Sequence, residues 1–405
     1  MEAVRLPARR ALEFGIYRDG DNNLDTSQEA AVHQAQRVSA ANPAIQFTVE
    51  DTRENFGGAA TVRSTIQDGS EVADGGPGPA DDMASPGNLA RFVARTLDNG
   101  EKFGVKQTWI ELVDHGAGDG GGLEADSFKQ LMPMPEIAQA IADGVQLHAR
   151  AHPEDAGRKV DGVVANQCLM ASLGFADALS HAGVKWLAAS PETMVSPGVP
   201  SNVADAIARN LGNPHTIGKA IVGDVMRQTY GSGAFGWQPA AAFDVLDLDP
   251  GKRAAVETGV KAFNDAVATR ASNAAEVQAL REDASSIQGM VRFHEATPDM
   301  PWHADRPAIA LYDTIANDAR LDPQLRSSAK DAEKAVRALV LAHTESSAFG
   351  PFDGADYRDA IGPTVHFPAT AKQVDPWAPR ITETHNRFFD ETDAARAFSA
   401  LERSE

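Results

Sequence analysis

The 405-residue sequence contains a single cysteine, Cys168. One cysteine forms no disulfide within the chain, so the fold has to be stabilised by packing. Basic residues are also scarce, because 37 Lys and Arg stand against 57 Asp and Glu and give a formal net charge of −20. This charge argues against nucleic acid or an anionic membrane as a partner, since both are negatively charged themselves.

Long apolar runs are missing as well. No window approaches the roughly 18 consecutive apolar residues of a membrane-spanning helix, and residues 1–11 lack the apolar stretch of an export signal. The sequence therefore predicts no membrane partner and the cytoplasm by default, with export of a processed form as the alternative. The oligomeric state stays open.

Two common hydrolase motifs are absent. The sequence contains neither a Gly-x-Ser-x-Gly segment nor a His-Glu-x-x-His segment. These motifs carry the nucleophile of many serine hydrolases and the metal ligands of many zinc proteases. Their absence excludes the commonest forms of both classes.

Predicted strands and helices alternate along the first part of the chain. Alternation of period-2 and period-3.6 apolar patterns predicts strands at 13–19, 45–52, 108–113, 162–165 and 186–189, and helices at 27–41, 85–97, 135–149 and 170–181. On the 85–97 helix, Leu89, Phe92, Val93 and Leu97 share one face. The order predicts an α/β fold, with a mostly parallel sheet covered by helices on both faces.

The pattern changes near Pro250. Long helical windows at 250–282, 306–320 and 323–345 follow, together with a strand-like piece at 363–368. Segments 71–86 and 116–123 are rich in Gly, Pro or Asp and predict surface loops. We therefore expect a domain at 12–250 and a mainly helical C-terminal subdomain at 251–405 that packs on the sheet.

His115 and Cys168 each follow a predicted strand. In parallel sheets, functional groups gather beyond the carboxyl ends of the strands, so neighbouring strands would bring the imidazole and the thiol together. Gly116 would let its N–H face a developing oxyanion, and a helix starting just after Cys168 would favour the thiolate. The alternatives are a cysteine that fills the core and a histidine that caps a turn.

Four landmarks occur in a characteristic order: Tyr17–Asp25, Val113–Gly116, Cys168–Ala171 and Ala188–Thr193. Together they resemble the clostripain family of cysteine peptidases, which is related to caspases, legumains and gingipains. The resemblance covers residues 12–250 and, more weakly, 363–368. It implies a caspase-like α/β/α sandwich and a polypeptide substrate. It also implies Cys168 as nucleophile, His115 as general acid–base, and the N–H groups of Gly116 and Cys168 as oxyanion hole.

One position departs from the family pattern. Family members carry aspartate two residues before the cysteine, where it selects a basic substrate side chain, whereas this sequence has Asn166. An amide lacks the full negative charge that Arg or Lys seeks, which weakens the expected preference for basic residues. The nearby carboxylate of Glu192 would compensate for the missing negative charge. The alternative is a pocket that accepts a neutral polar or a small substrate side chain. Several family members also cut themselves after a basic residue in the loop that follows the histidine. Lys129 lies in that stretch, so it is a self-cleavage candidate, or an ordinary exposed lysine.

No cofactor or metal is predicted as a requirement. Asp19, Asp21, Asn23 and Asp25 alternate as in a calcium loop, but Leu24 replaces the required glycine and Ala30 the bidentate glutamate. Capping of a helix near Thr26 explains these acids better, and calcium is kept as an alternative because clostripain-like enzymes can depend on it. His148 and His152 are four residues apart without a third ligand nearby in sequence, which predicts surface histidines.

Two other functions compete with the peptidase. Asn166 and the Ser190–Glu192 loop, where Pro191 would reshape the pocket wall, suggest a non-catalytic caspase-like module that binds peptides. Gly116–Gly121 matches a dinucleotide fingerprint, but no helix is predicted directly after it and no acid ends the next strand. The dinucleotide interpretation is therefore the weakest.

Overall fold

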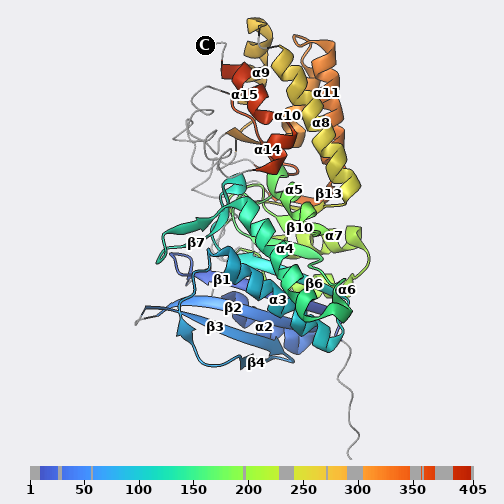
Figure 1. The fold of residues 1–405 in the computed structure, drawn as a ribbon. Helices are drawn as coiled ribbons and strands as arrows, with labels where there is room; N and C mark the ends of the chain where they lie inside the picture. Colours follow the sequence, from blue (N-terminus) through green and yellow to red (C-terminus); the bar gives the residue numbers. More distant parts are fainter. Residues whose placement is uncertain are drawn as a thin grey trace, which may run out of the picture.

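The computed structural model describes residues 10–25, 30–55, 58–194, 198–227, 241–270, 272–289, 304–346, 357, 360–369 and 386–402. Figure 1 shows a sheet with helices on both faces and a helical part stacked above one end of it. None of the helices in these ranges is long and apolar enough to cross a membrane.

Parallel strands form the centre of the main sheet. In spatial order they are β10 (Trp186–Ala189), β9 (Gly162–Asn166), β6 (Gln107–Val113), β1 (Leu12–Gly20) and β2 (Ile45–Asn55). All of them lie within or close to the strands predicted from the apolar pattern. The carboxyl ends of β6 and β9 are level, because Val113 is paired with Asn166.

Antiparallel strands extend this sheet on both sides. Beyond β10 lie β11 (Ala241–Asp247) and β13 (Val340–Ser346); beyond β2 lie β3 (Gly58–Gln67) and β4 (Ser70–Ala73), and β5 (Gly78–Pro79) pairs with β3. The sequence does not predict β3, and it assigns the β13 residues to a helix. That assignment is wrong because pairing with β11, a contact distant in sequence, decides their conformation.

Each face of the sheet has its own core. One face is covered by α3 (Pro86–Phe103), α4 (Met134–Ala151) and α5 (Leu173–His181), and the other by α2 (Ala30–Ala41), α6 (Val203–Arg209) and α7 (Pro214–Val225). The predicted inner face of α3 is confirmed, since Leu89, Phe92, Val93 and Leu97 are all buried. The three-layer α/β/α arrangement is thus the predicted one.

The C-terminal part is mainly helical and has a third core. Its helices are α8 (Pro250–Thr269), α9 (Ala274–Ser286), α10 (Ala308–Asn317), α11 (Pro323–Arg337), α14 (Arg387–Glu391) and α15 (Ala394–Glu402). Within it, β12 (Asp305–Pro307) pairs with β14 (Thr364–His366), which includes most of the strand predicted at 363–368. Thr364 also donates its N–H to the carbonyl of Ala171 at 2.8 Å, so this strand reaches the segment after Cys168.

Candidate active site

The loops that carry His115 and Cys168 lie against each other at the carboxyl edge of the sheet. The side-chain amide of Gln167 donates to the carbonyl oxygen of His115 at 2.8 Å. A Cβ on Gly116 would overlap with the carbonyl oxygen of Cys168 and lie 3.0 Å from its nitrogen. The glycine therefore allows an approach of the two loops that any side chain would prevent.

The Cys168 thiol is turned toward the loop that follows β10. Its sulfur accepts a hydrogen bond from the Met194 N–H at 3.3 Å. Burial raises the pKa of the thiol, Glu192 raises it further, and the N–H groups of Met194 and Cys168 itself only partly oppose this. This arrangement favours the protonated thiol over the thiolate.

The prediction that a helix dipole stabilises the Cys168 thiolate is wrong. The helix after Cys168 begins only at Leu173, where Ser172 caps α5 by accepting from the Phe175 N–H. Between them the chain turns at Leu169, whose φ of 67° is left-handed, and Leu169 donates to the carbonyl of Glu192 at 3.0 Å. Cys168 is therefore outside the first turn of the helix, where the dipole acts.

The His115 ring has a partner that the sequence does not predict. Its Nε2 lies 2.8 Å from Asn23 Oδ1. His115 and Cys168 are both described, and no hydrogen bond joins their side chains. Two signals for Asn23 are its place in the Tyr17–Asp25 landmark and its position beyond the carboxyl end of β1, which neighbours β6 in the sheet.

Asp114 fixes the His115 loop in place through hydrogen bonds to its neighbours. This buried carboxylate accepts from Asn22 Nδ2 at 2.6 Å and from the Glu124 N–H. Burial and the nearby Asp19 raise its pKa well above the usual range, while the N–H groups of His115 and Glu124 lower it. The loop after β1 and the loop after β6 are thereby linked into one support for the imidazole.

The four side chains with calcium-loop spacing point to four different partners. Asp19 accepts from the Asp21 N–H, and Asp21 accepts from the hydroxyl and N–H of Ser127. Asn23 faces the His115 ring, and Asp25 pairs with Arg18 at 3.0 Å. Calcium at this loop stays a prediction. The helix cap expected near Thr26 falls on residues 26–29, outside the described ranges.

Asn166 and Glu192 flank the Cys168 loop and are both buried. The Asn166 amide donates to Glu111 Oε1 at 2.9 Å and exchanges two hydrogen bonds with the backbone of Val199. Burial raises the pKa of Glu111 to about 8, with the Asn166 hydrogen bond opposing it. Glu192 Oε2 accepts from the Thr193 N–H at 2.8 Å. Glu111 thus joins the candidate residues, although no sequence motif marks it.

The glycine-rich segment after His115 forms a short 3-10 turn, η1 (Gly118–Gly120). It leads into a hairpin of β7 (Gly122–Ala125) and β8 (Gln130–Met132), so only part of the predicted 116–123 loop is irregular. No helix follows the glycines within this described segment, which removes the support a dinucleotide would need. Lys129 is exposed in the hairpin turn with a left-handed φ of 53°.

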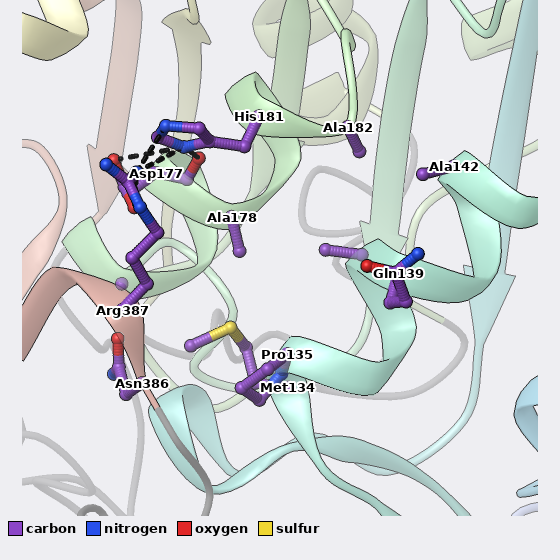
Figure 2. Close-up of a pocket in the computed structure, with 12 residues that line it drawn as sticks. Met134, Pro135, Gln139, Ala142, Asp177, Ala178, His181, Ala182, Asn386 and Arg387 are labelled. Carbon is purple, nitrogen blue, oxygen red and sulfur yellow. Dashed lines mark hydrogen bonds and ion pairs between the residues drawn. The ribbon is translucent and has the colours of Figure 1, made fainter.

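A separate cavity of about 200 Å³ lies between α4, α5 and α14 (Figure 2). Asp177 at its wall accepts from Arg253 at 3.1 Å and from Arg387 at 3.4 Å. Figure 2 shows His181 beside Asp177 and Arg387. Neither His115 nor Cys168 lines this cavity. Asp177, Arg253 and Arg387 pair with one another, and these hydrogen bonds connect α14 and α8 to α5.

No protein-family model matches this chain, and no curated protein matches it in sequence. Solved structures do resemble it. An inactive zymogen of a C11 protease from Parabacteroides distasonis has a TM-score of 0.63 at 12% identity, with 96% of this chain and 99% of that chain covered. A secreted C11 cysteine protease from Bacteroides thetaiotaomicron, solved with an irreversible peptide inhibitor, has a TM-score of 0.63 at 11% identity, with 95% and 99% covered.

These matches confirm the fold predicted from the resemblance. The chain has the α/β/α sandwich of the C11, or clostripain-family, cysteine proteases over nearly its whole length. The likeness includes the helical C-terminal part, since it covers more than nine tenths of both partners in each pair.

Proposed function

We propose that the protein is a cysteine endopeptidase in which Cys168 is the nucleophile and His115 the general acid–base. The observation that carries the proposal is the contact of the two loops, where Gly116 lies against the backbone of Cys168. The N–H groups of Gly116 and Cys168 would form the oxyanion hole. A donor of this kind contributes about 3 kcal/mol to transition-state stabilisation.

The proposed reaction uses the Cys168 thiol and the His115 imidazole at the carboxyl edge of the sheet. The Cys168 proton passes to His115 as the sulfur attacks the carbonyl carbon of the scissile bond. The imidazolium then gives its proton to the leaving amine, which leaves an acyl-enzyme. His115 next takes a proton from water as the water oxygen attacks the thioester carbonyl. The imidazolium then returns this proton to the departing sulfur, which frees the acid product and restores the thiol.

The Cys168 thiol and the His115 imidazole both have to rotate before this reaction starts. The sulfur is bonded to the Met194 N–H, and the imidazole to Asn23. Rotation about the Cα–Cβ bonds redirects a side chain without moving the backbone, and catalytic hydrogen bonds are often incomplete without substrate. We infer that substrate binding at the His115 and Cys168 loops brings the sulfur and the imidazole together.

Substrate selection would rest on Asn166 and Glu192. The Asn166 amide is occupied by Glu111 and Val199, so it offers a basic side chain little attraction. We expect weak preference for Arg or Lys before the scissile bond. A panel of fluorogenic peptides that differ at this position measures it, and strong selection of arginine would contradict the expectation.

Self-cleavage after Lys129 is a further part of the proposal. The exposed hairpin turn is accessible to another protease molecule. Intact-mass analysis of the active protein, with a Lys129→Gln control, tests it. An active chain of full length would argue against processing at this site.

A non-catalytic peptide-binding module is the second candidate. It is favoured by the separate partners of His115 and Cys168 and by the occupied amide of Asn166. Turnover of a peptide library by the native chain, Cys168→Ala and His115→Ala decides between the two. The peptidase requires loss of turnover in both variants, whereas the binding module shows none in the native chain.

A further inference from the structure

A cluster of histidines and acids lies at the end of the sheet opposite to Cys168. It joins the last turn of α3, the last turn of α4 and the short helix η2 (Pro153–Asp155). Because α3 precedes β6 and α4 precedes β9, these ends meet at the amino edge of the strands. His115 and Cys168 follow the carboxyl ends, so this cluster is separate from the candidate active site.

The surface interpretation of His148 and His152 is wrong for His148. Its side chain has no exposed area, while that of His152 is 32% exposed. The two rings are stacked with centroids 4.9 Å apart. The third side chain, which the sequence does not reveal, comes from α3, where Asp98 Oδ1 faces one nitrogen of each ring.

Three atoms converge in this cluster. Asp98 Oδ1 lies 2.6 Å from His148 Nδ1 and 3.4 Å from His152 Nε2. Zinc with ligands at 2.0–2.1 Å in a tetrahedron requires ligand atoms about 3.3 Å apart. The Asp98–His152 pair already has this spacing, and the Asp98–His148 pair has to open by several tenths of an ångström.

A buried nitrogen without a hydrogen-bond partner indicates the direction in which the His148 ring moves away from Asp98. His148 Nε2 is buried and has no hydrogen-bond partner, and Asp155 Oδ2 lies 3.6 Å from it. The two ring nitrogens face opposite carboxylates. A shift of the ring away from Asp98 therefore brings Nε2 within hydrogen-bonding distance of Asp155.

The second imidazole has the same arrangement. His152 Nδ1 faces Glu101 Oε2 at 2.7 Å, while its Nε2 faces Asp98. Metal-binding histidines usually donate their other ring N–H to a carboxylate, which fixes the tautomer and orients the ring. Both histidines have such a carboxylate, and Arg158 holds Asp155 in place.

We propose that Asp98, His148 and His152 form a zinc site that fastens the end of α3 to the end of α4. Two imidazoles and one carboxylate with a fourth position open to solvent are a donor set that Zn²⁺ takes readily. Asp155 and Glu101 orient the two rings. The site lies far along the strands from the thiol and stabilises the fold rather than supplying a catalytic metal.

Zinc titration of the full chain, stripped of metal by a chelator, tests the proposal. The titration is made in a Cys168→Ala background, because a free thiolate can bind zinc on its own and Cys168 is the one cysteine of the sequence. Calorimetry is expected to show one site that is lost in His152→Gln and kept in His215→Gln, a control at an exposed histidine of α7. His152 is partly exposed, so its substitution leaves the apolar cores intact.

Two further readouts sharpen the outcome. Glu101→Gln, which leaves all three ligands in place, is expected to weaken zinc binding about 10–100-fold. Zinc is also expected to raise the melting temperature of the His215→Gln chain but not that of His152→Gln. Equal zinc binding by His152→Gln and His215→Gln, or no uptake by the native cluster, would overturn the proposal.

Discussion

The residue with the least expected role is Asn23. Its carboxamide oxygen holds the His115 ring, although its spacing with Asp19 and Asp21 suggests calcium. His115 and Cys168 themselves are predicted from their places after two strands. The roles of Asn23, Asp114 and Glu111 are not, because side-chain partners across neighbouring strands depend on register. Parallel strands buried on both faces lack the alternating pattern that would specify it.

Asn23→Ala removes the partner of the His115 imidazole. We expect kcat/KM to fall by about tenfold or less, compared with about 10²–10⁴-fold for His115→Ala, because an orienting group contributes less than the acid–base itself. The pH profile of kcat/KM in Asn23→Ala provides the second readout, and its acid limb should shift. Asn317→Ala, at an exposed position at the end of α10, is the control. An Asn23→Ala profile identical to that of Asn317→Ala would remove Asn23 from the site.

Gly116→Ala tests the contact between the two loops. The added methyl group overlaps with the Cys168 carbonyl and lies 2.9 Å from Gln167 Cβ, so the backbone has to move. We expect hydrolysis to fall by about 100-fold or more, since one displaced oxyanion donor costs this much. Gly157→Ala meets no atom within 4 Å and is the matched control. Normal turnover in Gly116→Ala would show that the loops do not form the site.

At the scale of elements, local pattern predicts the central strands and α3 well. It fails where a partner distant in sequence decides the conformation. Examples are β3, which is paired with β2, and β13, which is paired with β11. The start of α5 is a third case. Its cap, Ser172, also binds the buried Asp119 carboxylate, and Asp119 comes from a loop more than fifty residues earlier in the chain.

Ser172→Ala removes two interactions at the start of α5. The Phe175 N–H loses its acceptor, and Asp119 loses a hydroxyl donor. We expect the free energy of unfolding to fall by about 2 kcal/mol, from the lost cap and from the buried acid left with fewer partners. Thermal melting checks it against Asn213→Ala, which removes only a cap, at α7. Equal melting temperatures of these two variants would contradict the added role of Asp119.

At the scale of the whole molecule, buried acids make stability depend on pH. Burial raises the pKa of Glu13 and of Glu111 to about 8, against hydrogen bonds that lower it. Burial also raises the pKa of Asp19 and Asp119 to about 7. These groups hold protons in the folded chain that the unfolded chain releases at lower pH.

The sign follows from this difference in bound protons. Between the unfolded pKa of 4.5 and the folded pKa of about 8, Glu111 binds more protons in the folded chain, so stability falls as pH rises. The slope is about 1 kcal/mol per pH unit for each such group. Glu111→Gln is expected to flatten the fall in melting temperature between pH 5 and 8, whereas Glu136→Gln, at an exposed site, keeps it. Stability that rises over this range would contradict the account.

The overall arrangement is only partly predictable from sequence. The change in pattern near Pro250 marks the start of the helical part, whose core is separate. Yet β13 returns to the main sheet, and β14 contacts the segment after Cys168 through Ser172 and Thr364. Such long-range contacts involve short strands with few apolar residues, so no local pattern reveals them.

The central claim is that Cys168 is a nucleophile served by His115. The most direct measurement is the rate at which a peptidyl electrophile modifies the protein, followed by intact mass together with residual hydrolysis. Because the chain has one thiol, we predict one added group, on Cys168, with hydrolysis lost in proportion and labelling slowed in His115→Ala. Labelling no faster than that of free cysteine, or hydrolysis that survives complete modification, would contradict the account.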